Sequence, residues 1–135
     1  VWAVGLDVWS SRLAVHWDGS RWSTMPAPPV FAPYSVWAAT ADSVWVGGSG
    51  TRPLARWDGT SWITVDVPTD FIVDMGGSGA DDVVAVGGPY DPVHWNGATW
   101  EVEPIPTCVS LRSVWALPTG EVWVAAASGM LKRTP

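Results

Sequence analysis

The chain has 135 residues, a net charge of −6 at neutral pH, and only 15% charged residues. This length suffices for one domain with its own core, and the negative charge argues against nucleic acid and anionic membrane surfaces as partners, since both attract cationic proteins. The lone Cys108 excludes an intrachain disulfide, and no apolar run is long enough to span a membrane.

Tryptophan dominates the aromatic residues, with 12 Trp against two Tyr and two Phe. Glycine and proline are also frequent, with 14 and 12 copies, whereas strong helix formers such as Lys, Glu and Gln are scarce. Together with the many Val and Thr residues, this balance predicts an all-β protein with numerous tight turns.

A tryptophan motif recurs along the chain. "WDGSRW" at 17–22 returns as "WDGTSW" at 57–62 and as "WNGATW" at 95–100. Asp-Gly and Asn-Gly tolerate positive φ and favour hairpin turns. The even-numbered loop places the two Trp residues of each copy opposite one another, which pins the strand register. We therefore expect three buried, structural Trp pairs: Trp17 with Trp22, Trp57 with Trp62, and Trp95 with Trp100.

Each period of about 39 residues contains four short apolar runs, named strands A to D in chain order. In chain order the clearest runs are 1–5 (B), 13–17 (C), 35–40 (A), 43–48 (B), 53–57 (C), 71–76 (A), 82–88 (B), 92–95 (C), 113–118 (A) and 121–126 (B), and a D run ending in proline follows each Trp motif. The B runs are apolar on both faces, so both faces must be covered.

A repeat of about 40 residues with four strands is typical of a β-propeller blade. We predict an all-β partial β-propeller of about three and a half four-stranded antiparallel blades. The predicted blades are 1–33 (partial), 34–69, 70–110 and 111–135 (partial). An alternative takes 1–5 as strand A and 7–9 as strand B; the Val-Gly ending of 1–5 favours strand B.

The pattern "VWAVG…HWDGSRW…MPAP" resembles the Trp-rich propeller repeats of bacterial surface proteins. The Gly-Gly after strand B, with the later Trp and Pro, resembles kelch repeats. The Asp-Gly turn followed by Trp is similar to the Asp-box of sialidase-type propellers, although the full Ser-x-Asp-x-Gly-x-Thr-Trp motif is absent. The resemblance implies a fold and leaves the function open, because such folds carry many activities.

Several residues invite chemical interpretations that the repeat explains better. His16 and His94 occupy the same blade position, so a shared metal site is not expected. The two "GGSG" segments precede no helical pattern and are interpreted as loops, not phosphate-binding sites. Cys108 is expected to be a small buried residue. The acids in the A-to-B turns are expected to form turns and aid solubility, not to bind calcium: Asp42, Asp81, Asp82 and Glu121. No cofactor and no metal is expected.

The loops between strands B and C differ among the repeats, at 5–12, 47–53 and 87–92. In propellers these loops and the D-to-A connections lie on one face, which commonly binds ligands. An aromatic ring beside hydrogen-bonding groups suits a sugar or a peptide. The predicted ligand-binding residues are Trp9, Arg12, Arg52, Tyr90 and Asp91. The alternative is ordinary loop variation, with Trp9 packed on a neighbouring blade.

These observations favour a non-catalytic binding or scaffold module of an extracellular or cell-surface protein, which recognises a glycan, as a lectin does, or a protein. One alternative is a purely structural array, completed by a second copy or by the remainder of a longer chain, because partial blades would expose apolar faces. A second alternative is a sialidase-like glycoside hydrolase. It requires two convergent carboxylates, and no spacing singles out a pair among Asp66, Asp70, Asp74, Asp91, Glu101 and Glu103.

Overall fold

A computed structural model describes residues 1–88, 90–106 and 108–135, and the described residues form four antiparallel sheets. The predicted loop 87–92 therefore contains one residue, at position 89, outside the described part. The strands are β1 (Trp2–Leu6), β2 (Arg12–Trp17) and β3 (Trp22–Met25) in the first sheet; β4 (Ser35–Thr40), β5 (Ser43–Gly47), β6 (Leu54–Trp57) and β7 (Trp62–Val65) in the second; β8 (Asp74–Gly79), β9 (Asp82–Val86), β10 (Val93–Trp95) and β11 (Trp100–Val102) in the third; and β12 (Leu111–Ala116), β13 (Val122–Ala126) and β14 (Gly129–Arg133) in the fourth.

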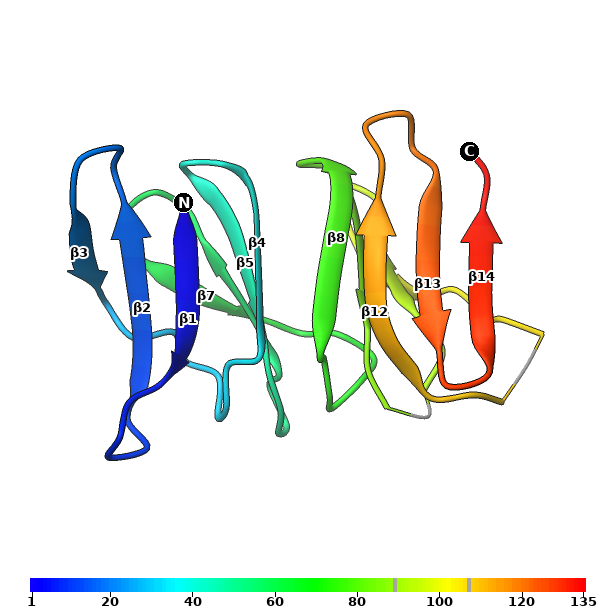
Figure 1. Cartoon of the computed structure of the whole chain (residues 1–135), viewed down its shortest axis with the longest axis horizontal. Coiled ribbons are helices and arrows are strands. Elements are labelled where there is room, and N and C mark those ends of the chain that lie inside the picture. Colours follow the sequence, from blue (N-terminus) through cyan, green and yellow to red (C-terminus); the bar gives the residue numbers. More distant parts are fainter. Residues whose placement is uncertain (89, 107) are drawn as a thin grey trace.

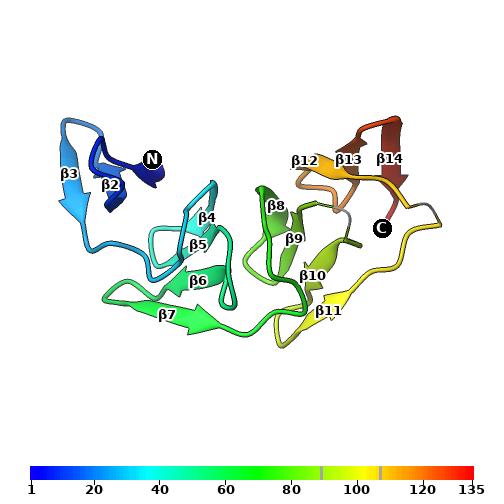
Figure 2. The same ribbon diagram turned by 90° about the horizontal axis from the view of Figure 1, so that it is seen from below.

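The four sheets stand side by side in a curved row (Figures 1 and 2). Within each sheet the strands follow chain order, so that each sheet is a simple meander. Figure 2 shows β4, β8 and β12 on the inner side of the curve and β7 and β11 on the outer side. This is the arrangement expected for consecutive propeller blades. No helix in the described part of the chain is long and apolar enough to cross a membrane.

The first sheet begins with a B strand. β1 pairs with β2 through five residues, with Trp2 opposite His16. Residues 7–9 lie outside any strand, in the turn that joins β1 to β2. The interpretation of 1–5 as strand B is therefore correct, and the alternative that placed strand B at 7–9 is wrong.

Each Trp motif forms a C-to-D hairpin with its two Trp residues directly opposite one another, as predicted. In the second sheet Asp58 fixes the turn, because its Oδ1 accepts hydrogen bonds from the backbone N–H groups of Thr60 and Ser61, both at 2.8 Å. Gly59 has a φ of 97°, which glycine adopts without strain. Hydrogen bonds from Ser61 and Thr60 to the carboxylate lower the pKa of Asp58 to about 2.

The Trp pairs also join neighbouring sheets. The ring of Trp2 in the first sheet lies 6.0 Å from Trp57 and 6.1 Å from Trp62 in the second. One interface further along, Trp45 of the second sheet contacts the next pair, at 5.4 Å from Trp95 and 5.3 Å from Trp100. In these two interfaces the strand-B Trp of one sheet thus packs against the Trp pair of the next, and these aromatic contacts join the first three sheets.

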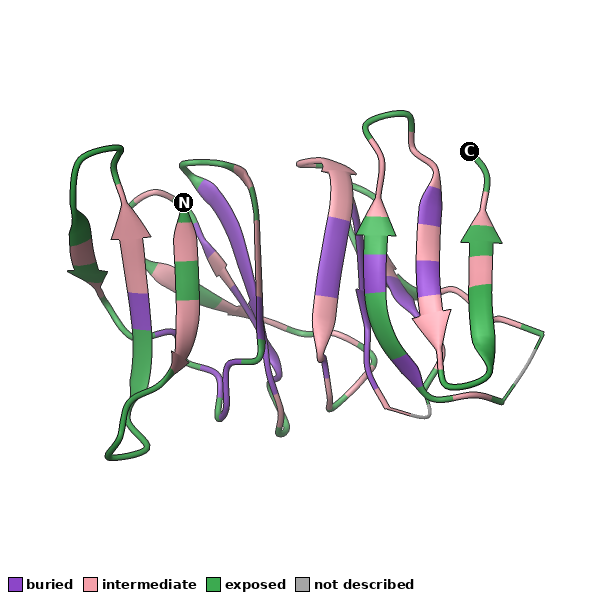
Figure 3. Cartoon of the chain, in the orientation of Figure 1, coloured by how far each residue is buried: buried purple, intermediate pink, exposed green. Residues whose placement is uncertain are grey.

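The expectation that all three pairs are buried is wrong for the first pair and holds only in part for the other two, in which Trp57 and Trp100 are buried but Trp62 and Trp95 are partly buried. Trp57 is buried, at 6% exposure, but Trp22 is 53% exposed. The reason is that Trp2 covers the pair formed by Trp57 and Trp62, whereas no described residue covers the outer face of the first sheet in the same way. Figure 3 shows the same trend, with buried residues concentrated in the two middle sheets.

The Gly-Gly that follows strand B is required by a close backbone approach. A Cβ on Gly48 would lie 2.2 Å from the carbonyl oxygen of Ala32, and one on Gly87 would lie 2.4 Å from that of Phe71. Ala32 and Phe71 belong to the D-to-A connections, which cross directly against the end of strand B. Only glycine leaves room for this crossing.

The predicted burial of Cys108 is wrong, because the residue is exposed. It belongs to the connection between β11 and β12. That connection runs over the surface, and Ile105, Val109 and Leu111, not the cysteine, pack against the hydrophobic core.

Candidate functional site

The loops between strands B and C lie at one end of the sheets, at the lower edge of Figure 1. Trp9 occupies the loop between β1 and β2 and is 83% exposed. Asp7 shapes this loop, since its Oδ1 accepts the backbone N–H groups of Trp9 at 2.9 Å and Ser11 at 2.8 Å. The loop therefore presents the indole to solvent, and Trp9 does not pack on a neighbouring sheet.

Arg12 lines a shallow depression of about 520 Å³ on the same loop. The depression is shared with Phe31 of the connection between β3 and β4, a residue with a largely exposed ring. Ser10 and Ser11 supply hydroxyl groups at its rim. A flat ring, hydroxyls and a guanidinium together provide both an apolar surface and polar partners.

Tyr90 extends a row of aromatic residues at the same end of the molecule. Tyr34 meets Phe71 edge to face, with ring centroids 5.7 Å apart. A Cβ on Gly88 would lie within ordinary contact of both Phe71 and Tyr90, at 3.5 and 3.6 Å. Both rings thus lie close to Gly88, and Tyr90 is 45% exposed. Below, the term loop face denotes Trp9, Arg12, Phe31, Tyr34 and Tyr90.

The other two predicted residues make contacts within the chain. Asp91 Oδ1 accepts the backbone N–H of Ile105 at 3.2 Å and so ties two connections together. Arg52 Nη1 donates to Thr64 Oγ1 at 3.5 Å. The structure therefore brings Arg12 to a depression, exposes Trp9 and Tyr90, and gives Asp91 a structural contact.

Asp82 is a structural ion-pair residue, so the expected turn-forming and solubilising role is wrong for it. Its carboxylate binds Ser78, His94 at 2.7 Å and Arg133 at 3.1 Å. Partial burial opposes ionisation, but these partners outweigh it and hold the pKa of Asp82 below its usual value. Arg133 also binds Glu103 at 2.9 Å, so one guanidinium joins two carboxylates.

Within residues 1–88, 90–106 and 108–135, no group of three or more His, Cys, Asp or Glu side chains is placed to hold a metal ion. His94 binds Asp82, as above, while His16 stacks on Trp2 with ring centroids 4.8 Å apart. The two histidines occupy equivalent positions, each directly before the first Trp of its motif and opposite a strand-B residue, Trp2 for His16 and Val84 for His94.

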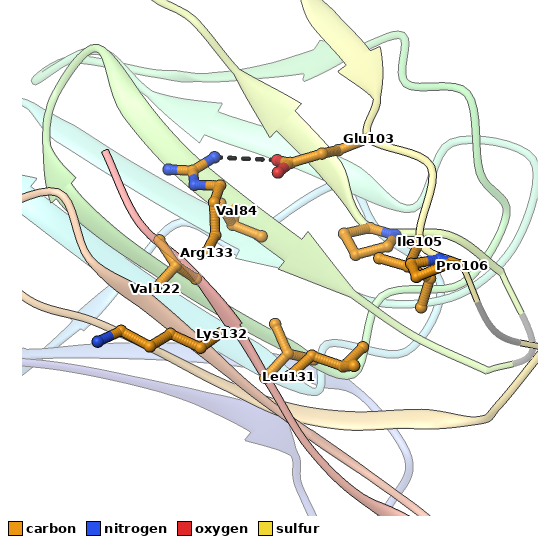
Figure 4. A pocket seen from close by; sticks show the side chains of 10 residues that line it. Val84, Glu103, Ile105, Pro106, Val122, Leu131, Lys132 and Arg133 are labelled. Carbon is orange, nitrogen blue, oxygen red and sulfur yellow. Dashed lines mark hydrogen bonds and ion pairs between the residues drawn. The ribbon is translucent and has the colours of Figure 1, made fainter.

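A cleft of about 270 Å³ separates the third and fourth sheets (Figure 4). Its walls are mainly apolar, and the Arg133–Glu103 ion pair lies at its edge. The apolar side chains come from both sheets and from the connection after β11: Val84, Ile105, Pro106, Val122, Val124 and Leu131. None of the ligand-binding residues predicted from the sequence lines this cleft.

The cleft exists because the interface between the third and fourth sheets lacks the indole side chains that fill the interface between the second and third sheets. Val84 stands where Trp45 stands one sheet earlier, as their partners His94 and Arg56 show. Arg133, paired with Val122, replaces Trp95, and no described strand supplies a counterpart of Trp100. The signal was present in the repeats, since "DVVAVGG" at 82–88 has Val at the position of Trp in "SVWVGG".

A second hollow, of about 420 Å³, lies on the inner side of the row, between β8 and β12. Gly76 and Gly77 line it together with Trp37 and the largely exposed Trp115. Asp74, which also lines this hollow, accepts three hydrogen bonds through its carboxylate: from Ser113 Oγ at 2.6 Å and from the backbone N–H groups of Val114 and Met75 at 2.9 Å. The carboxylate of Asp74 on β8 thus binds to two residues of β12.

Comparison with known proteins identifies the fold. No protein-family model and no curated protein matches the chain. Among solved structures, the chain is similar to YCF48 from Cyanidioschyzon merolae, with a TM-score of 0.67 and 17% identity over 98% of this chain and 49% of that one. It is also similar to the structure described as YCF48 bound to D1 peptide, with a TM-score of 0.65 and 20% identity over 78% of this chain and 39% of that one.

The chain is an all-β partial propeller, as the sequence predicted, and belongs to the β-propeller class of folds. It spans less than half the length of these structural neighbours. At this level of identity the likeness establishes the fold alone.

Proposed function

We propose that this chain is a non-catalytic propeller module that binds a polypeptide partner through the loop face. The observation that carries the proposal is the exposure of aromatic rings from different sheets at one end of the molecule, above all Trp9 and Tyr90. Exposed aromatic residues next to arginine are typical of binding surfaces. A structural neighbour described as bound to a peptide supports a polypeptide as the ligand.

The experiment is a selection of peptides from a displayed random library, followed by titration of the enriched peptides. Trp9→Ala and Tyr90→Ala should each weaken binding about tenfold or more, with little change in melting temperature because both side chains are exposed. Trp115→Ala is the matched control, a largely exposed Trp of β12 that lines the hollow between β8 and β12. Enriched peptides that bind all three variants like the unmodified chain would contradict the proposal.

A glycan is the second ligand class that the loop face suits. The depression beside Arg12 and Phe31 offers an aromatic surface with the hydroxyls of Ser10 and Ser11 around it, which is the chemistry of sugar recognition. A glycan array run on the same labelled chain separates the two classes. Either ligand fits an extracellular or cell-surface location, which we propose on the resemblance to bacterial surface repeats of kelch or Asp-box type.

Assembly with a second copy is the alternative role, and one observation favours it. Trp123 is the strand-B Trp of the fourth sheet, equivalent to Trp45. The pair Trp17 and Trp22 of the first sheet has no strand-B Trp packed against it among the described residues. End-to-end docking of two copies would reproduce the internal contact, and light scattering over a range of concentrations would reveal it.

Hydrolysis in the manner of a sialidase is the least supported alternative. The carboxylates that the structure gathers, Asp82 and Glu103, both bind Arg133. That contact ties both carboxylates into one ion-pair network. A general acid needs a raised pKa, and the pKa of Asp82 is lowered.

A further inference from the structure

The inner strand of the third sheet lacks the tryptophan that the inner strands on either side of it carry. In the second and fourth sheets strand A has a Trp directly opposite the strand-B Trp, namely Trp37 in β4 and Trp115 in β12. In the third sheet the equivalent residue of β8 is Gly76, which lies opposite Val84. The A strand and the B strand of the third sheet therefore both lack the indole found at these positions in the other two sheets.

The indole of Trp37 shows where such a side chain goes. It reaches the next sheet, because a Cβ added to Gly77 of β8 would lie 2.7 Å from Trp37 Cζ2 and 2.8 Å from Trp37 Cη2. Position 76 faces the fourth sheet in a similar way, since a Cβ there would lie 3.4 Å from the backbone nitrogen of Ala116 and from the carbonyl oxygen of Val114. Because residue 76 is glycine, no side chain from it covers the surface between β8 and β12.

The hollow of about 420 Å³ on the inner side of the row lies at this place. Gly76 and Gly77 line it from β8, residues 113–116 line it from β12, and Trp37 lines it from the second sheet. The strands of all three sheets that form it are described by the structure, and the volume falls in the range typical of small-molecule sites. The hollow therefore has the size of a ligand site and one aromatic side chain in its wall.

Backbone groups give the hollow a polar side. β8 pairs with β9 on one side only within the described residues. In an antiparallel ladder alternate residues direct their backbone N–H and C=O groups away from the partner strand, so one of the two consecutive glycines, Gly76 or Gly77, presents these groups along the inner edge of β8. The carboxylate of Asp74 accepts a hydrogen bond from Ser113 of β12 at 2.6 Å and so fixes the two strands relative to one another.

We propose that this hollow binds a small planar aromatic molecule of the indole class. The ring lies over Gly76 and Gly77, beside the indole of Trp37, and covers the surface that a Trp at position 76 would cover. Aromatic rings in contact attract one another in offset or edge-to-face arrangements. The N–H of the ligand donates to the backbone carbonyl presented by β8. This site is separate from the loop face and adds a small-molecule ligand to the proposed binding of a polypeptide.

The test uses indole that carries one fluorine on its benzene ring, followed by fluorine NMR, since the chain contributes no fluorine signal. Titration with the unmodified chain should give a saturable change in shift and linewidth, with a dissociation constant on the order of 1 mM or below. Unlabelled indole should displace the probe. Cyclohexanol should displace it about tenfold less well, because a saturated ring does not stack on Trp37. This comparison does not depend on the folding of any variant.

Two variants of the chain locate the site. Gly76→Leu places a side chain in the hollow and should weaken binding of the probe about tenfold or more. Gly79→Leu is the matched control, because Gly79 lies on the same strand, does not line the hollow, and would meet nothing within 4 Å of an added Cβ. Neither glycine has a positive φ, so both positions accept a side chain. Binding should be unchanged in Gly79→Leu and in the loop-face variant Trp9→Ala.

The absence of a saturable change with the unmodified chain overturns the proposal, as does equal displacement of the probe by indole and cyclohexanol. Equal binding of the probe by folded Gly76→Leu and Gly79→Leu also overturns it, because the ring would then lie elsewhere on the molecule. Calorimetric melting of both variants establishes that they are folded.

Discussion

Replacing Trp45 by alanine tests the packing between the second and third sheets. The side chain is 1% exposed and contacts Trp95 and Trp100. Truncation of a buried Trp costs about 3–5 kcal/mol. The indole N–H of Trp45 is buried without a hydrogen-bond partner among the described residues, so its removal offsets about 1 kcal/mol of that loss. We expect a loss of about 3 kcal/mol, or about 10 °C in melting temperature for a chain of this length.

Urea unfolding followed by circular dichroism, together with calorimetry, measures this loss. Trp45→Phe keeps a ring and removes the unpaired N–H, and it should cost less than about 1.5 kcal/mol. Trp115→Ala, a largely exposed Trp, should stay within about 0.5 kcal/mol of the unmodified chain. If Trp45→Ala is no more destabilising than Trp115→Ala, the indole contacts do not hold the sheets together and the reasoning fails.

Three further predictions concern the turns, the strand crossings and the cysteine. Because the pKa of Asp58 is lowered to about 2, its ionised carboxylate stabilises the fold fully above the ordinary pKa near 3.8, and this stabilisation is lost as the pH falls towards about 2. Asp58→Asn should keep the turn, as Asn96 does in the third copy of the motif. The variant should therefore show a flatter dependence of melting temperature on pH in this range. Gly48→Ala should prevent or severely weaken folding because its Cβ would lie 2.2 Å from a carbonyl oxygen, whereas Gly79→Ala meets nothing within 4 Å and should melt close to the unmodified chain. Cys108, being exposed, should react with iodoacetamide in the folded chain, and mass spectrometry will detect the adduct; a thiol that reacts only after unfolding would contradict its placement.

The repeat made the fold predictable from the sequence. The Asp-Gly turns and the Trp residues around them act locally, so the pairing of Trp57 with Trp62 follows from the spacing alone. The Val-Gly ending of residues 1–5 likewise identified the strand that starts the first sheet. Such features depend on residues close in sequence, where turn chemistry and alternation suffice.

The remaining features depend on contacts between distant segments. Asp82 meets Arg133 across 51 residues, and no local pattern indicates that contact. The cleft arises because Val84 and Arg133 occupy positions at which the preceding sheets have Trp. Such a substitution can be recognised in the sequence only when the repeats are aligned position by position. Cys108 was misplaced because composition predicts burial for a free cysteine, whereas its position on a surface connection decided otherwise.

Hydrogen exchange measured by mass spectrometry on the unmodified chain tests the central claim, a row of antiparallel propeller sheets with buried B strands at its centre. The account predicts the slowest exchange in β5 and β9, whose residues are almost all buried and which pair with a strand on each side. It predicts fast exchange in β14, whose residues are mostly exposed and which pairs on one side only. Protection of β5 and β9 no greater than that of β14 would contradict the account, because strands buried on both faces must exchange more slowly than a mostly exposed one.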